Sequence, residues 1–126
     1  MGIRSNLYGD SLALLTDLYQ LTMAYGYWKL GRAEQEAAFH LTFRSPPFDG
    51  GFSIACGLGY VREFLARFGY EDADLAYLAT LHGADGKALF EPAFLEYLRT
   101  LRLDADVDAI PEGTAVFPHE PLVRVT

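Results

Sequence analysis

The chain of 126 residues has a single cysteine, Cys56, and few basic residues, with ten Lys and Arg against seventeen Asp and Glu and a net charge of −7. One cysteine excludes a framework of internal disulfides and fits a reducing compartment. The basic residues are scattered singly, so no basic stripe is present to neutralise a nucleic-acid backbone. We therefore expect no binding to DNA or RNA, although one arginine can still hold a small phosphorylated ligand.

Long apolar runs are also missing. No run approaches the roughly 18 to 20 apolar residues needed to cross a bilayer, and residues 1–6 lack the apolar core and cleavage site of a signal peptide. These absences predict a cytoplasmic protein that makes no contact with membranes. Hydrophobic residues nevertheless make up 51% of the chain, which is typical of a globular protein with a packed core.

Sequence motifs for metal and nucleotide binding are sparse. His40, His82 and His119 stand far apart without ligand-type neighbours, so we expect no metal held by protein side chains. Gly57-Leu58-Gly59 lacks the third glycine of the dinucleotide fingerprint, and we interpret it as a tight turn from a strand into a helix. Cys56 lies in an apolar stretch, where the simplest interpretation is a small core residue.

The chain does contain a helix with apolar side chains on two faces. Asp17 with Gln20 three residues later predicts a capped helix start, and Gly31 predicts its end, giving a helix over about 17–30. At 100° per residue, one face carries Leu14, Leu18, Leu21, Tyr25 and Trp28, and the other carries Leu15, Tyr19, Met23 and Tyr27. A helix that is apolar all round is normally buried. The second face must therefore be covered by the rest of the chain, a longer polypeptide, a second subunit or a ligand.

Three side chains are candidates for substrate binding, and each has a structural alternative. Tyr19 lies in the first turn, beside unpaired N–H groups that favour carboxylates and phosphates, but it is equally explained as a buried aromatic. Asp17 is explained by capping alone. Arg44 closes a predicted strand, where its planar guanidinium suits phosphate and could instead pair with Asp49 at the surface.

The rest of the chain mixes short strands with helices. Alternation over 38–44 and an apolar run over 52–56 predict two strands that form a hairpin-like pair, with the second strand buried. Helical spacing recurs over about 60–68, 71–81 and 92–101, and strand patterns occupy about 107–126. Because the last strand pattern continues to Thr126 without a polar, glycine or proline stop, we expect residues 1–126 to be the N-terminal part of a longer polypeptide.

Five separated motifs give the chain a resemblance to a known family. They lie at residues 14–23 (LLTDLYQLTM), 43–44 with 47–52 (FR and PFDGGF), 55–58 (ACGL), 109–114 (AIPEGT) and 118–122 (PHEPL). In this order they resemble the N-terminal portion of nicotinate phosphoribosyltransferase, from Leu14 to the end of the chain. That family forms nicotinate mononucleotide and pyrophosphate from nicotinate and phosphoribosyl pyrophosphate, with ATP hydrolysis, in NAD salvage.

The resemblance implies an α+β fold, the N-terminal domain of a type II phosphoribosyltransferase with helices packed on a mostly antiparallel sheet. An α/β barrel that this chain does not contain would carry the catalytic residues and the phosphorylated histidine. The chain alone would then be inactive. The family is dimeric, and each N-terminal domain completes the active site of its neighbour. Tyr19 would contact the pyridine ring, Asp17 would lie beside it, and Arg44 would meet phosphates; magnesium would arrive with phosphoribosyl pyrophosphate.

Two alternatives to this function remain open at the level of sequence. The chain could be a non-catalytic interaction domain whose apolar helix binds a partner protein. It could also belong to a related phosphoribosyltransferase that acts on nicotinamide or quinolinate, because the groups that select the ring lie mostly outside the chain.

Overall fold

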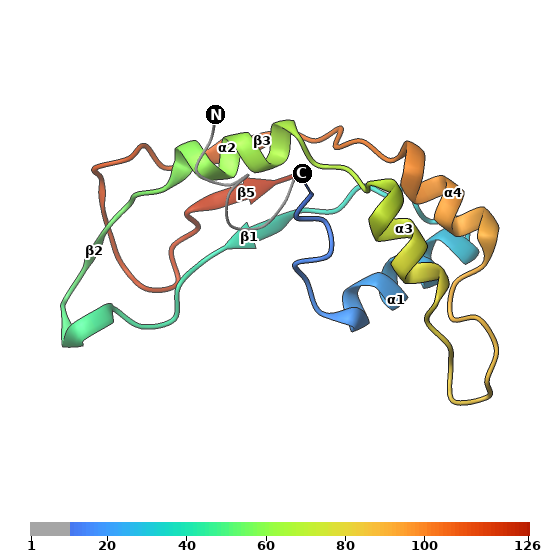
Figure 1. Cartoon of the computed structure of the whole chain (residues 1–126). Helices are drawn as coiled ribbons and strands as arrows, with labels where there is room; N and C mark the ends of the chain where they lie inside the picture. The colour runs from blue at the N-terminus through green and yellow to red at the C-terminus, as the bar shows by residue number, and fades with distance from the viewer. Residues whose placement is uncertain (1–10) are drawn as a thin grey trace. The chain divides into compact units, whose positions relative to one another are not determined.

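The computed structural model describes residues 11–126, and the chain divides into two compact units. The described part of the first unit comprises residues 11–35 and 67–103, and the second unit comprises 36–66 and 104–126. Helices α1, α3 and α4 belong to the first unit, and strands β1 to β5 belong to the second, together with α2 (Figure 1). Helices combined with antiparallel sheets confirm the predicted α+β class.

Three helices build the first unit: α1 (Leu18–Lys29), α3 (Asp72–Ala79) and α4 (Pro92–Thr100). Helix α4 begins with proline at its first turn, where the missing N–H has no intrahelical partner to lose. The buried core of the unit consists of Leu21, Leu75, Leu78, Phe90, Phe94 and Leu98. Phe94 is fully buried, and its ring lies 4.9 Å from that of Tyr25 and 5.6 Å from that of Trp28. Aromatic packing therefore fastens α1 to α4.

Helix α1 ends at Lys29 and is followed by a Schellman arrangement at Gly31. Gly31 has φ of +67°, its N–H donates to Trp28 O, and Arg32 N–H donates to Tyr27 O. Only glycine adopts this backbone conformation without a steric cost. The predicted end of the helix at this glycine is therefore explained by its local geometry.

We expect Gly31→Ala to lower the free energy of unfolding by about 1–2 kcal/mol, because alanine is strained at a positive φ even though open space surrounds the position. Gly26→Ala is the matched control, because Gly26 lies inside α1 with nothing near its missing Cβ. There alanine should stabilise the protein by about 0.5–1 kcal/mol. Urea unfolding of both variants measures the difference, and equal stabilities would contradict this account of the helix end.

An exposed ion pair joins the end of α1 to the start of α4. Lys29 Nζ donates a hydrogen bond to the carboxylate of Glu91, the N-cap residue of α4. This hydrogen bond holds the pKa of Glu91 below its usual value and the pKa of Lys29 above its usual value. Because both groups are exposed to solvent, the pair specifies geometry more than it adds stability.

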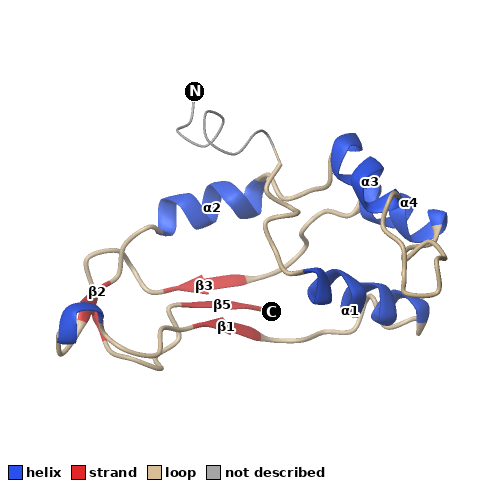
Figure 2. Ribbon diagram, turned by 60° about the horizontal axis from the view of Figure 1, so that its bottom comes forward, coloured by secondary structure: helices blue, strands red, loops and turns tan. Residues whose placement is uncertain are grey.

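The second unit contains two small antiparallel sheets and helix α2 (Leu58–Ala66). One sheet has the order β1-β5-β3, formed by β1 (Phe39–Leu41), β5 (Val123–Val125) and β3 (Val107–Ala109). The other pairs β2 (Ser53–Ile54) with β4 (Ala115–Val116), and a short 3-10 helix, η2 (Pro47–Asp49), precedes β2. Both views show α2 running alongside β3 (Figures 1 and 2).

The predicted hairpin between the strands at 38–44 and 52–56 is wrong. Strand β1 pairs with β5, and β2 pairs with β4. The connection between β1 and β2 contains Pro46 and Pro47, which have no N–H to donate, followed by Phe48 and Asp49 at positive φ. This loop does not bring its two flanking strands into register, so each pairs with a strand from the C-terminal segment.

The prediction that residues 52–56 are buried is also wrong. Phe52 and Ile54 are each more than half exposed, and Cys56 is exposed rather than a core residue. The buried side of this two-stranded sheet is instead carried by Val116, which lies opposite Ser53. A continuous apolar run does not reveal which of its alternating side chains face inward.

Candidate functional site

Helix α1 is buried on one face and bare on the other. Leu21 is buried, and Leu14, Tyr25 and Trp28 pack against the core of the first unit. The opposite face is exposed along its whole length, from 49% for Met23 to 71% for Leu15, with Tyr19 and Tyr27 in between. Leu18, expected on the core face, is itself 49% exposed, because it stands at the first helical position, ahead of the packed part of the helix.

Asp17 occupies the N-cap position of α1, but its side chain makes no capping hydrogen bond. The expected box between Asp17 and Gln20 is therefore absent. Gln20 instead accepts a hydrogen bond from the Thr16 hydroxyl through its Oε1 atom. Among residues 11–126 the Asp17 carboxylate has no hydrogen-bond or ion-pair partner, which leaves it available to a ligand.

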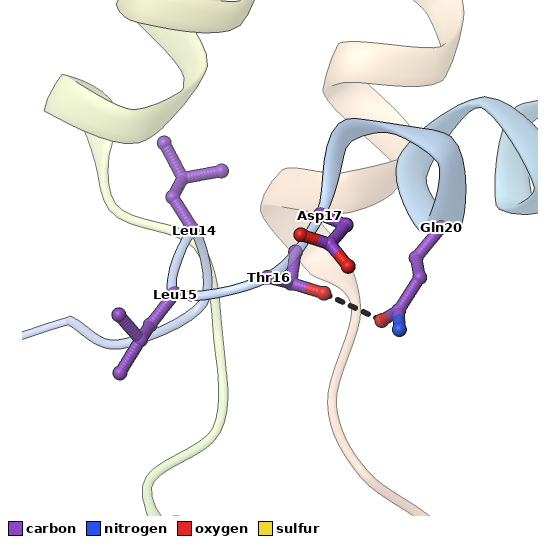
Figure 3. A pocket seen from close by; sticks show the side chains of 5 residues that line it. All are labelled: Leu14, Leu15, Thr16, Asp17 and Gln20. Atoms are coloured by element: carbon purple, nitrogen blue, oxygen red, sulfur yellow. Dashed lines mark hydrogen bonds between the residues drawn. The ribbon is translucent and has the colours of Figure 1, made fainter.

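These residues line an open hollow at the start of α1 (Figure 3). Its volume is about 580 Å³, and its lining consists of Leu14, Leu15, Thr16, Asp17 and Gln20. The two leucines lie at one end, and the polar side chains lie at the other. A surface that combines apolar side chains with a few polar groups suits a small, flat, polar ligand.

Tyr19 stands next to this hollow without lining it. Its side chain is 58% exposed. The alternative interpretation of Tyr19, as a buried aromatic of the core, is therefore wrong for this structure. The Tyr19 hydroxyl lies 3.5 Å from Gln20 Nε2, and Gln20 itself lines the hollow. Gln20 therefore connects the exposed ring to the polar end of the hollow.

Arg44 belongs to the second unit, whereas Asp17 and Tyr19 belong to the first. It follows β1, and its side chain is exposed. The neighbouring Phe43 O accepts a hydrogen bond of 2.9 Å from His119 N–H, which fixes the backbone just before the arginine. Within residues 11–126 Arg44 forms no ion pair with Asp49, so the alternative interpretation of Arg44 as the partner of that aspartate is not seen.

No group of three or more His, Cys, Asp or Glu side chains between residues 11 and 126 could hold a metal ion. Over the same residues, no helix combines the length and the apolar content required to span a bilayer.

Sequence reasoning missed Thr16 and gave Gln20 the wrong partner. Thr16 lies just before the N-cap Asp17, and Gln20 lies in the first turn of α1, four residues further along the chain. This spacing is the signal that could have identified the pair, but the stronger preference of aspartate for the N-cap position hid it.

The comparison with protein families decides the class of the chain. The model of the nicotinate phosphoribosyltransferase (NAPRTase) N-terminal domain matches residues 14–126. The chain belongs to the nicotinate phosphoribosyltransferase family. The resemblance carried by the five motifs is thereby confirmed.

Individual relatives agree with this family. The chain is 47% identical to nicotinate phosphoribosyltransferase from Bos taurus and to that from Homo sapiens, in each case over 114 residues that make up 90% of this chain and 20% of the relative. A crystal structure of human nicotinic acid phosphoribosyltransferase aligns with a TM-score of 0.74 and 48% identity, over 89% of this chain and 22% of that one. The chain therefore spans about a fifth of the length of the relatives it matches.

Proposed function

We propose that this chain is the N-terminal portion of a nicotinate phosphoribosyltransferase. The complete enzyme forms nicotinate mononucleotide and pyrophosphate from nicotinate and phosphoribosyl pyrophosphate, with ATP hydrolysis, as a step of NAD salvage in the cytoplasm. The observation that carries the proposal is the family match over residues 14–126, together with 47% identity to two relatives of that name. The exposed Tyr19 beside a hollow of mixed polarity supports it, because nicotinate is a flat ring with one carboxylate.

Each candidate side chain suits a different part of these substrates. The ring of Tyr19 offers a stacking surface for the pyridine ring. As the ring nitrogen attacks the ribose carbon and pyrophosphate leaves, positive charge develops on the pyridine, and the unpartnered Asp17 carboxylate beside it would stabilise that charge. The planar guanidinium of Arg44 suits phosphate groups of the sugar substrate. Magnesium carried with phosphoribosyl pyrophosphate would neutralise the pyrophosphate, and we assign no residue of this chain to hold it.

We further propose a homodimer with a shared active site. Supporting this, exposed apolar side chains run from Leu15, just before α1, to Tyr19, Met23 and Tyr27 on the helix, a larger apolar stripe than a helix facing only solvent normally shows. A neighbouring subunit that covers this stripe would place Tyr19 against a substrate held chiefly by the barrel of that neighbour. The catalytic residues are then expected outside residues 1–126.

Pyrophosphate release by the complete gene product tests the function. With phosphoribosyl pyrophosphate and ATP present, we expect release with nicotinate and far less with nicotinamide or quinolinate. The 126-residue chain alone should release none, because its residues hold the substrates without the catalytic groups. A preference for either competing ring would favour a related phosphoribosyltransferase, and no release with any pyridine would favour the non-catalytic interaction domain.

A further inference from the structure

Gln20 is held in place by Thr16 and touches Tyr19. The Thr16 hydroxyl donates to Gln20 Oε1, which fixes the orientation of the side-chain amide. The amide nitrogen, Nε2, is then directed to the other side and lies 3.5 Å from the Tyr19 hydroxyl oxygen. Thr16, just before α1, and Tyr19 and Gln20, in its first turn, therefore form one chain of hydrogen bonds. Thr16 and Gln20 also line the hollow.

The direction of these hydrogen bonds determines what the site can recognise. Gln20 Nε2 carries two hydrogens, so it can donate to Tyr19 and still donate to a ligand. The Tyr19 hydroxyl accepts from Gln20 and keeps its own hydrogen for another acceptor. The Tyr19 hydroxyl therefore retains a hydrogen that it can donate to a ligand, and a donor of this kind suits a carboxylate.

The contact between Gln20 and Tyr19 is at the long end of the range of hydrogen-bond distances. A separation of 3.5 Å is longer than a strong hydrogen bond, and side chains at adjacent helical positions do not normally face each other. The hydrogen bond from the Thr16 hydroxyl to the other end of the amide therefore helps to keep Gln20 Nε2 beside the tyrosine hydroxyl.

We infer that Gln20 is a positioning residue for the pyridine substrate: anchored by Thr16, it orients Tyr19 so that the tyrosine hydroxyl donates to the carboxylate of the ring. The inference rests on the proposed function and adds to it a role for two residues. In this role Gln20 links the hollow, which it lines, to the exposed ring of Tyr19, which lies beside the hollow.

Gln20→Met in the full-length enzyme tests the role, because methionine keeps the length and helix preference of glutamine but removes both donors. We expect the KM for nicotinate to rise about tenfold while kcat is unchanged, as for a lost hydrogen bond to a charged group. Thr16→Val should shift the KM in the same direction, and Thr16→Ser, which restores the hydroxyl, should return it to the wild-type value. Gln35→Met is the control, since it makes the same change at an exposed position that does not line the hollow.

A double-mutant cycle separates positioning from a merely local effect. If Gln20 acts through the tyrosine hydroxyl, adding Gln20→Met to Tyr19→Phe raises the KM no further than Tyr19→Phe alone. Effects that multiply would overturn the inference, and so would a wild-type KM in Gln20→Met.

Titration calorimetry with nicotinate distinguishes this failure from failure of the proposed function. Equal affinities of the wild type and Gln20→Met would refute only the role of Gln20. Absence of nicotinate binding by the wild type, under conditions where phosphoribosyl pyrophosphate binds, would refute the proposed function and the role of Gln20 with it.

Discussion

Replacing Tyr19 with alanine in the full-length protein should lower kcat/KM for nicotinate between about 5-fold and 150-fold. The estimate corresponds to the roughly 1–3 kcal/mol that stacking of a base on an aromatic side chain contributes by alanine substitution. Because the side chain is 58% exposed, its removal leaves no cavity, and the free energy of unfolding should stay close to that of the wild type. Steady-state kinetics with nicotinate, alongside thermal unfolding, measure both quantities.

Tyr77→Ala is the matched control for this change. Tyr77 lies on α3 with the same 58% exposure, so truncation removes an equivalent ring from a surface remote from the hollow along the chain. We expect wild-type kinetics in this variant. Unchanged kinetics in Tyr19→Ala would show instead that the exposed ring has no part in substrate binding.

Replacing Phe94 with alanine should destabilise the first unit by about 3–5 kcal/mol, the cost of truncating a fully buried phenylalanine. Phe94 has no exposed surface, and its ring packs against those of Tyr25, Trp28, Phe90 and Tyr97. The cavity would loosen α1 from α4, so the start of α1 would lose the support that holds the site in place. Activity should therefore fall at temperatures where the wild type is still stable.

Hydrogen exchange followed by mass spectrometry measures this loss unit by unit, since it reports the free energy of opening for each segment. Protection should fall in peptides from α1, α3 and α4 of Phe94→Ala, and much less in peptides from the strands of the second unit. Phe117→Ala, at a side chain that is 52% exposed, provides the control. Wild-type protection in α1 of the Phe94 variant would mean that this aromatic cluster does not hold the helix.

The helices could be located from the sequence because their signals are local. The predicted range of about 17–30 compares with Leu18–Lys29 for α1, and about 92–101 compares with Pro92–Thr100 for α4. Gly31 and Pro92 act on the residues beside them, through the backbone conformation that each favours. Such effects operate over one turn of helix, so they need no knowledge of the rest of the fold.

The strand partners could not be predicted in this way. The connection from β1 to β2 was short enough to suggest a hairpin, yet β1 pairs with β5 and β2 with β4. Pairing depends on which backbone edges meet after the chain has folded, and several edges in this chain have similar β-forming residues. The exposure of Phe52, Ile54 and Cys56 followed from that pairing and not from their apolar character.

The candidate site was likewise predicted only in part from the sequence. The five motifs in their order indicated the family, and the two apolar faces of the first helix were visible in the spacing of its residues. The sequence could not say which face would be bare, because that depends on where α3 and α4 pack. The sequence also did not reveal that Gln20 would accept a hydrogen bond from Thr16 instead of forming a capping box with Asp17.

The sequence by itself therefore determined the family, the α+β class and the position of the helices, because these depend on motifs and on interactions between near neighbours along the chain. Tertiary structure alone decided which strands pair, which side of α1 is left uncovered, and which polar side chains gather around Tyr19. These choices depend on contacts between residues distant in the chain, where many alternatives have similar local energies and only the packed fold selects among them.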